Sequence, residues 1–190
     1  MNAKAEQKTR THGVILESAA RLLRERGIAG ARVADVMSGA GLTVGGFYAH
    51  FESKEALVRD TLRRTAAEMR ERLFHRLDEK PPDSRAVVVV KRYLSALHRD
   101  QPAPGCPLPA VAGEIGTTAP EYGEVLAEQV EAMTEGLRDQ LRGPSRRQVA
   151  LALVALMYGG LTLARAVSGT PLSDELLKAC RSAGELMTRA

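Results

Sequence analysis

The sequence has few of the features that mark secreted, membrane or disulfide-rich proteins. It holds two cysteines in 190 residues, Cys106 and Cys180, which are too few and too far apart for a disulfide framework. Its first fifteen residues are polar and lack the apolar stretch of a signal peptide. The longest uncharged run, 149–164, is shorter than the roughly 20 apolar residues that a bilayer span needs. We therefore expect a cytoplasmic protein without a membrane partner.

Signs of catalysis are also scarce. The four histidines show no metal-ligand spacing; they are His12, His50, His75 and His98. His50-x-Glu52 resembles the start of a zinc deaminase motif, but no paired Cys-x-x-Cys follows it. The sequence has no Gly-x-Ser-x-Gly motif and no P-loop. We predict no catalytic residue, no metal and no cofactor, and an all-helical enzyme is the weaker alternative.

The charge is unevenly divided along the chain. The net charge is +4, and residues 1–100 hold 19 Lys and Arg against 13 Asp and Glu. Residues 101–190 hold 8 basic against 10 acidic residues. Lys4, Lys8 and Arg10 form a basic arm that leads into the first predicted helix. A basic N-terminal half is suited to phosphate binding.

The segment 41–55 predicts a short helix that meets another surface. Thr43 is a suitable N-cap, yet Gly45 and Gly46 occupy the first turn, where each costs a helix about 1 kcal/mol relative to alanine. Glycines at this place let the backbone approach a partner closely, and N–H groups there suit a phosphate. Phe47 and Phe51 are predicted to anchor the opposite face in a core, which leaves Tyr48, His50 and Lys54 outward. We interpret this segment as the recognition helix of a DNA-binding helix-turn-helix.

The flanking segments support a helix-turn-helix. Apolar residues from Val33 to Ala40 repeat with helical spacing, and Gly41 can end that helix. An upstream helix is predicted to stop at Gly27. Downstream, Ser53 is a predicted cap for a long helix that reaches about residue 80. Residues 10–80 thus fit three helices followed by a long fourth.

The block 27–57 resembles the N-terminal domain of TetR/AcrR-type transcriptional regulators. The run Tyr-x-His-Phe-x-Ser-Lys-Glu at 48–55 is its most specific part. The matching residues are Gly27, Val33, Asp35, Val36, Ala40, Gly41, Gly45, Tyr48, His50, Phe51, Ser53, Lys54 and Leu57. The resemblance covers about the first third of the chain. It implies an all-helical homodimer that represses genes and releases DNA when a small molecule binds its larger C-terminal domain.

Two places depart from the family pattern. Ala31 and Arg32 stand where the family has a phosphate-binding Thr or Ser, so an oriented cap is lost although Arg32 can reach a phosphate. Val44 and Gly46 replace a common Lys and Thr, which leaves Val44 with apolar contact to a thymine methyl. The operator sequences of other family members therefore cannot be assigned to this chain. The predicted DNA-binding residues are Arg10, Arg32, Thr43, Val44, Gly45, Gly46, Tyr48, His50 and Lys54.

Prolines and capping patterns divide the rest of the chain into five further helices, which makes about nine in an all-α fold. The fifth predicted helix runs from Asp83 to Arg99, and the sixth from Leu108 to Thr117. The seventh begins at a capping box whose first residue is Thr118 and ends at Gly143. A second capping box at Ser145 begins the apolar eighth helix, and Thr170 or Ser173 begins the last. We predict a DNA-binding domain at 1–52 and an effector-binding and dimerisation domain at 53–190.

The eighth helix is apolar over more than one face, so one partner surface cannot bury it. With the ninth helix it predicts a homodimer through residues 145–168 and 172–188, whose two recognition helices read palindromic double-stranded DNA. The fourth predicted helix would connect a ligand pocket in the C-terminal domain to the recognition helices. A bulky, mostly apolar effector is expected. Its predicted contacts are Met69, Leu73, Tyr93, Leu97, Cys106, Val111, Ile115, Tyr122, Met133, Tyr158 and Thr162.

Two alternatives remain for how such a regulator works. Cys106 lies before a predicted helix start, where N–H dipoles can lower a thiol pKa, so it could sense oxidants or electrophiles. Alternatively, Cys106 is a small packing residue at a tight turn. We expect Cys180, which lies in the last predicted helix, to be a packing residue as well. A DNA-binding architectural protein without any effector is the second alternative.

Overall fold

The structure, a computed structural model, describes residues 3–101, 105 and 107–189, without the side chain of Lys4. These residues form an all-α fold of nine α-helices and three short 3-10 helices, and they contain no strand. The α-helices are α1 (Ala3–Gly30), α2 (Val33–Gly39), α3 (Lys54–Phe74), α4 (Arg85–Tyr93), α5 (Ala96–Asp100), α6 (Leu108–Ile115), α7 (Gly123–Arg138), α8 (Arg146–Ala166) and α9 (Pro171–Met187). The 3-10 helices are η1 (Val44–Ala49), η2 (Pro82–Ser84) and η3 (Pro120–Tyr122).

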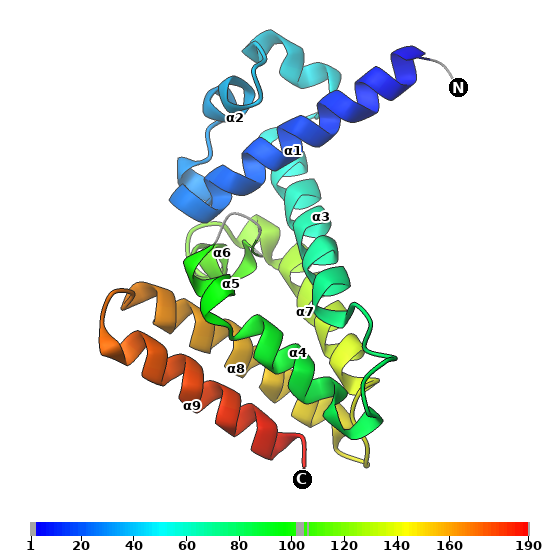
Figure 1. The fold of residues 1–190 in the computed structure, drawn as a ribbon. Coiled ribbons are helices and arrows are strands. Elements are labelled where there is room, and N and C mark those ends of the chain that lie inside the picture. Colours follow the sequence, from blue (N-terminus) through cyan, green and yellow to red (C-terminus); the bar gives the residue numbers. More distant parts are fainter. Residues whose placement is uncertain (1–2, 102–104, 106, 190) are drawn as a thin grey trace.

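The helices form a small head and a larger body (Figure 1). The head comprises α1, α2 and η1, and the body comprises α4 to α9. The long helix α3 leaves the head and runs down along the body, while α8 and α9 lie antiparallel at the opposite end. A continuous set of buried apolar side chains extends from Ile15 in α1 to Leu177 in α9. The predicted all-α class and the count of nine helices are confirmed for the described residues, although the helices are divided differently.

Two of the helix limits predicted for the head are confirmed. Gly27 breaks α1 with a backbone φ of 69° and ψ of −172°, after which one more helical turn leads to Gly30. The hydroxyl of Ser53 accepts a hydrogen bond from the N–H of Ala56 and caps α3, as predicted. The kink of α1 and the start of α3 are therefore set by Gly27 and Ser53, residues that can be recognised in the sequence.

Helix α3 ends at Phe74, earlier than the predicted limit near residue 80. The next residues leave the helical conformation, and Arg76 has a φ of 52°. The guanidinium of Arg92 in α4 donates hydrogen bonds to the carbonyls of Leu73 at 2.6 Å and His75 at 2.8 Å. The end of α3 is thus satisfied by a side chain from another helix.

The helix predicted from Asp83 to Arg99 is wrong as a single element. It is divided into α4 and α5 at Leu94, whose ψ of 41° leaves the helix. Ser95 caps the new helix by accepting from the N–H of His98. The break leaves the carbonyl of Leu94 without a helical partner, and this carbonyl accepts a hydrogen bond from Arg181 at 2.7 Å. Tertiary partners make this break favourable.

Both predicted capping boxes in the body are wrong. The hydroxyl of Thr118 donates backward to the carbonyl of Glu114, and α7 begins only after η3. Ser145 precedes α8 but makes no side-chain cap bond. Thr170 stands at the start of α9, whereas Ser173 lies inside it and donates to the carbonyl of Ala164 at 2.7 Å.

Helix α8 is long and rich in apolar residues. By length and composition alone it could cross a membrane, a test that the core helix of a soluble protein also passes. Only 39% of its most apolar stretch is buried within one copy of the chain. Its buried side packs closely on α9, because a Cβ on Gly160 would lie 2.7 Å from the Sγ of Cys180. Cys180 therefore has the packing role that we predicted for it.

Candidate DNA interface

A tight corner joins α2 to η1. The N–H of Leu42 donates to the carbonyl of Met37 at 2.9 Å, and the N–H of Gly41 donates to the carbonyl of Ser38 at 3.0 Å. Gly41 has a φ of 71°, so this is a Schellman motif with glycine at the position after the cap. The predicted helix end at Gly41 is confirmed, and the corner fixes the angle at which η1 leaves the head.

The predicted recognition helix is a six-residue 3-10 helix, η1, and not an α-helix. Thr43 precedes it without a side-chain cap bond, so the predicted capping role of its hydroxyl is wrong. Two glycines near the start and a length under two α-turns weaken the α-helical hydrogen-bond pattern. The predicted anchors are confirmed: Phe47 and Phe51 are both buried, and their rings stack with centroids 5.8 Å apart.

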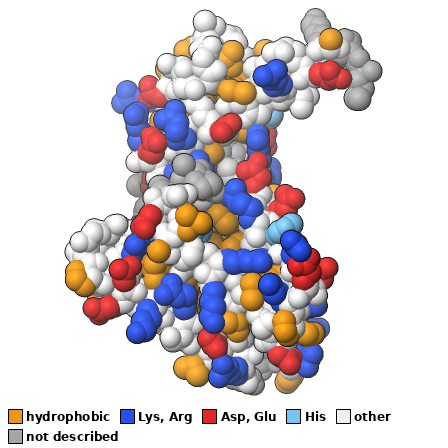
Figure 2. Space-filling model, viewed as in Figure 1, with side chains coloured by type: hydrophobic (Ala, Val, Ile, Leu, Met, Phe, Trp, Pro, Cys, Tyr) orange, Lys and Arg blue, Asp and Glu red, His pale blue; other side chains and the backbone are white. Residues whose placement is uncertain are grey.

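The opposite face of η1 is open to solvent. Val44 is 49% exposed and Tyr48 is 76% exposed, and Thr43 and Gly45 are exposed as well. Figure 2 shows the surface over this end of the head as largely uncharged, with most Lys and Arg side chains on the flank below it. This face therefore offers exposed backbone, the small side chains of Thr43 and Val44, and the ring of Tyr48 to a partner.

The two glycines of η1 are not required by the packing of the described residues. A Cβ on Gly45 would meet none of their atoms within 4 Å, and one on Gly46 would meet only the Cε of Met37 at 3.8 Å. Neither glycine has the positive φ that favours glycine over other residues. The fold thus gives no reason for glycine at two adjacent positions in a helix. A close approach by an external surface remains as a physical reason.

His50 lies between η1 and α1. Its ring centroid is 6.1 Å from that of His12, which stacks on Phe51, and its Nδ1 atom is buried without a hydrogen-bond partner among the described residues. Burial lowers the pKa of His50, and the charges of His12 and Lys8 lower it further. His50 is therefore neutral near pH 7 and only half exposed to a partner.

Lys54 is engaged within the protein. Its Nζ atom donates to the carbonyl of Ile28 at 2.9 Å, so it ties the start of α3 to the end of α1. Sequence reasoning expected it to face a partner freely, which is wrong for one of its three donors. Arg32 is the N-cap of α2 without a side-chain cap bond, as predicted, and both Arg32 and Arg10 are exposed.

Glu114 in α6 binds the kink of α1 and was missed by sequence reasoning. Its Oε1 accepts from the N–H of Ile28 at 2.9 Å, and its Oε2 accepts from the N–H of Ala29 at 3.1 Å. These N–H groups begin the turn after Gly27 and have no partner within that turn. One carboxylate of the body therefore caps a turn of the head. Gly27 indicated the kink in the sequence, but no sequence pattern indicated that Glu114 would bind there.

The predicted effector residues do not gather around one cavity. Met69, Leu73 and Leu97 line a cavity of about 410 Å³ between α3, α4 and α5, together with His98. Thr162 lines another cavity, of about 610 Å³. Tyr93 is buried and stacks on Tyr158 with ring centroids 5.6 Å apart. The remaining four described residues are core side chains, namely Val111, Ile115, Tyr122 and Met133. Cys106 lies outside the described residues.

His98 also lines the 410 Å³ cavity, and the sequence analysis predicted no role for it. It is 9% exposed, and its Nδ1 lies 2.8 Å from the carbonyl of Tyr93. Because a carbonyl only accepts, Nδ1 carries the proton and Nε2 is an acceptor. Burial lowers the pKa of His98 to about 4, and the charges of Arg165 and Arg72 lower it as well. Among the described residues, no three His, Cys, Asp or Glu side chains are placed to hold a metal ion.

Comparisons with known proteins agree with this geometry. Residues 15–61 match the family model described as "Bacterial regulatory proteins, tetR family". The HTH-type transcriptional repressor KstR2 of Mycobacterium tuberculosis (strain ATCC 25618 / H37Rv) is 41% identical over 63 residues, which are 33% of this chain. The match spans 32% of the length of that curated relative.

Solved structures resemble the fold over nearly the whole chain. A TetR transcriptional regulator from Chloroflexus aurantiacus J-10-FL is similar with a TM-score of 0.79 at 25% identity, covering 93% of this chain and 95% of its own. A putative TetR-family transcriptional regulator from Rhodococcus sp. gives a TM-score of 0.80 at 17% identity, covering 95% and 99%. The head and the body therefore share one known arrangement.

Proposed function

We propose that this chain, a member of the TetR family of bacterial regulatory proteins, represses transcription in the cytoplasm. In this proposal it binds palindromic double-stranded DNA as a homodimer and is released by a small molecule. The observation that carries the DNA-binding part is the glycine pair Gly45 and Gly46 in η1, because the packing of the described residues requires neither glycine and Gly45 is exposed. Residues 1–52 are the proposed DNA-binding domain, and 53–190 bind the effector and the second copy.

The proposed DNA contact places η1 in the major groove. The backbone at Gly45 and Gly46 approaches the base edges, and Val44 supplies apolar contact to a thymine methyl. Tyr48 and Thr43 stand beside it and are exposed enough to meet phosphates. Cations placed around this face hold the backbone on either side. They are Arg10, Arg32 and Lys54, with His50 as a neutral neighbour.

The proposed dimer forms through the outer faces of α8 and α9. On α9 the exposed residues recur every three to four positions from Leu172 through Ala179 to Leu186. On α8 the exposed positions include Ala155, Gly159 and Leu163, so small residues allow close helix approach. A second copy would cover this apolar surface. It would also present two η1 helices about 34–36 Å apart, the spacing of successive major grooves.

Effector response is proposed to act through the contacts between body and head. The cavity of Met69, Leu73 and Leu97 is the proposed site of a mostly apolar effector. Binding there would favour a conformation in which α3 and α6 are displaced, and α6 carries Glu114, which caps the kink of α1. The ligand shifts the population away from DNA only if it binds that other conformation better.

DNA selection followed by substitution tests the proposal. Wild-type protein selects duplexes from a random library, and we expect inverted repeats among them. Gly45→Leu should weaken binding to the selected DNA at least about tenfold, because a leucine side chain would separate backbone and bases, and about 1.4 kcal/mol corresponds to that factor. Gly113→Leu is the matched control, since a Cβ on that helical glycine also meets no described atom within 4 Å. Unchanged binding by a folded Gly45→Leu protein would refute the proposed interface.

A further inference from the structure

A buried nitrogen of His98 has no hydrogen-bond partner within the described part of the chain. The ring of His98 lines the 410 Å³ cavity between α3, α4 and α5, and the residue is only 9% exposed. Its Nε2 atom is buried and makes no hydrogen bond to any described residue. Buried polar atoms without a partner are rare, because nothing offsets their lost hydration, so each one calls for an explanation. A ligand in the cavity would supply the missing partner.

The fold fixes the kind of partner that Nε2 requires. The Nδ1 atom of His98 lies 2.8 Å from the carbonyl oxygen of Tyr93, and because a carbonyl only accepts, Nδ1 carries the ring proton. Burial lowers the pKa of His98 to about 4, so the ring is neutral at pH 7. Nε2 therefore presents a lone pair and accepts a hydrogen bond. Its partner has to be a donor.

The guanidinium of Arg92 also lines the cavity, but it is engaged at the end of α3. Its Nη1 atom donates to the carbonyl of Leu73 at 2.6 Å and to the carbonyl of His75 at 2.8 Å. These carbonyls stand at the negative end of the α3 dipole, which stabilises the cation in place. A carboxylate in the cavity would compete with them, and it would also set an acceptor against the lone pair of His98. The polar group that fits is thus a neutral donor.

The rest of the wall suits an apolar skeleton. Met69, Leu73 and Leu97 line the cavity. Leu97 is 66% exposed, so an apolar occupant would remove this side chain from water, which favours binding. Because Leu97 is exposed, its side chain can also turn aside and let an occupant reach the buried ring of His98. The cavity therefore combines an apolar wall with a buried acceptor.

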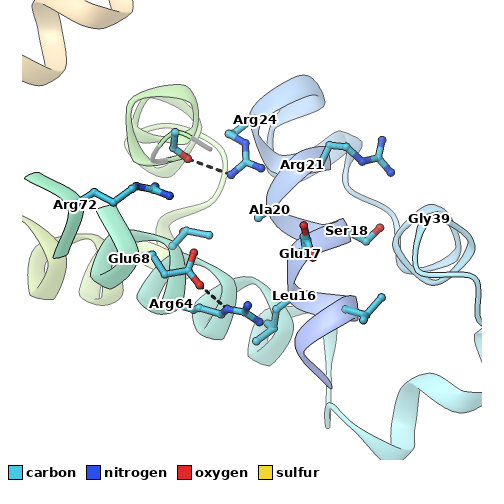
Figure 3. A pocket seen from close by; sticks show the side chains of 13 residues that line it. Leu16, Glu17, Ser18, Ala20, Arg21, Arg24, Gly39, Arg64, Glu68 and Arg72 are labelled. Carbon is cyan, nitrogen blue, oxygen red and sulfur yellow. Dashed lines mark hydrogen bonds and ion pairs between the residues drawn. The ribbon is translucent and has the colours of Figure 1, made fainter. Parts of the chain in front are cut away.

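The cavity between α1 and α3 is of a different kind (Figure 3). It measures about 520 Å³, and its lining includes the ion pair of Arg64 and Glu68 at 2.8 Å and the carboxylate of Glu17. An apolar compound that entered it would remove charged groups from water, which is unfavourable. A mostly apolar ligand with a single polar group is therefore better matched to the cavity of Met69 and Leu73.

We propose that the ligand of the 410 Å³ cavity is a neutral, mostly apolar compound with a hydrogen-bond donor, such as a phenolic hydroxyl, that donates to Nε2 of His98. Its skeleton lies against Met69, Leu73 and Leu97. That this ligand is an effector rests on the proposed function, to which the inference adds the chemical class of the ligand. An analogue without the donor would leave Nε2 unpaired in a buried site, so the cavity discriminates against it.

The probes are para-cyclohexylphenol and para-cyclohexylanisole, which share an apolar skeleton and differ in the hydroxyl proton. Calorimetric titration of the full chain without DNA measures both affinities, for wild type and for His98→Asn. Asparagine can still donate to the carbonyl of Tyr93 but has no acceptor at the position of Nε2. The ratio of phenol affinity to ether affinity should fall about tenfold in His98→Asn. The same ratio in both proteins would overturn the proposal.

Two controls locate the effect. Thr162→Val removes a hydroxyl from the 610 Å³ cavity and should leave the ratio unchanged, whereas a loss there would place the phenol in that cavity and overturn the proposal. The third probe, para-cyclohexylbenzoate, carries a carboxylate in place of the hydroxyl and should bind more weakly than the phenol. Tighter binding of the benzoate would show that a cation governs the site, which contradicts the proposed class.

A measurement on wild-type protein decides the question if His98→Asn does not fold. Nitrogen NMR of ring-labelled histidine should show that the phenol shifts the acceptor nitrogen of a neutral ring and that the ether does not. No such shift would overturn the proposal. Binding to the selected DNA is measured separately, with and without the phenol. Phenol-selective binding that leaves DNA binding unchanged would contradict the proposed effector response, while the class of ligand would stand.

Discussion

A Cβ atom on Gly27 would lie 1.8 Å from the Oε1 atom of Glu114. Glycine is thus required at this kink for two reasons, the close approach of a carboxylate from α6 and a φ of 69° with extended ψ. The contact joins the last turn of α1 to the body. Any motion of α6 therefore acts directly on the head.

Gly27→Ala should lower the free energy of unfolding by about 3–5 kcal/mol. Strain at this φ and ψ costs about 1–3 kcal/mol, and displaced Glu114 would lose hydrogen bonds of about 1 kcal/mol each. Urea unfolding measures the loss. Gly113→Ala is the matched control and should instead stabilise the protein by up to about 1 kcal/mol, since it lies exposed within α6. Equal effects of the two substitutions would argue against the contact.

His98 should make the protein less stable as the pH falls below about 6.5. Its pKa is about 4 in the folded state and near 6.5 when unfolded, so between these values only the unfolded chain binds the proton. The loss should reach about 2 kcal/mol at pH 5. Urea unfolding at pH 7, 6 and 5 measures it for wild type and for His98→Asn. Asparagine can still donate to the carbonyl of Tyr93 but does not titrate, so an identical pH dependence in both proteins would contradict this prediction.

Substitutions on the outer faces of α8 and α9 should separate the proposed dimer. Leu163 is 56% exposed and Leu186 is 68% exposed, and a glutamate at either place would bury charge between two copies. Sedimentation velocity should show a dimer for wild type and a monomer for each variant. Leu97→Glu is the control, because Leu97 is 66% exposed on α5, away from this face. A wild-type monomer at micromolar concentration would refute the proposed interface.

Lys54→Met should affect both stability and DNA binding. Removing the ammonium eliminates its bond to the carbonyl of Ile28, at a cost of about 1 kcal/mol in the unfolding free energy. It should also lower the slope of the logarithm of DNA affinity against salt by about one, if a phosphate binds the other donors. Lys80→Met is the comparison and should leave the slope unchanged, since Lys80 is exposed beyond the end of α3 and away from the head. An unchanged slope in Lys54→Met would assign Lys54 a purely internal role.

The sequence predicted those features that depend on neighbouring residues. The cap at Ser53, the helix end at Gly41 and the anchors Phe47 and Phe51 are set within a few residues, and all are confirmed. The candidate DNA face follows from the same local pattern. It stays a prediction.

The features that sequence reasoning missed depend on partners far along the chain. The break at Leu94 is favoured by Arg181, and the early end of α3 is satisfied by Arg92. Glu114 binds Ile28 and Ala29, which lie 86 and 85 positions earlier in the chain. A hydrophobic pattern along the sequence cannot predict a contact over that separation. The predicted effector residues all lie on, or next to, apolar stripes of the sequence. Such stripes do not distinguish a cavity wall from a filled core, which explains why Val111 and Ile115 are simply buried.

Both ends of α3 are fastened to other helices, by Lys54 at its start and by Arg92 at its last carbonyls. The helix has 21 residues and is therefore a stiff lever about 30 Å long. A tilt of about 5° around its lower end would carry its upper end sideways by about 3 Å. That displacement is close to the 3.4 Å rise of one base pair. In the proposed dimer, a modest swing of α3 would therefore be enough to move the two heads out of register with successive major grooves.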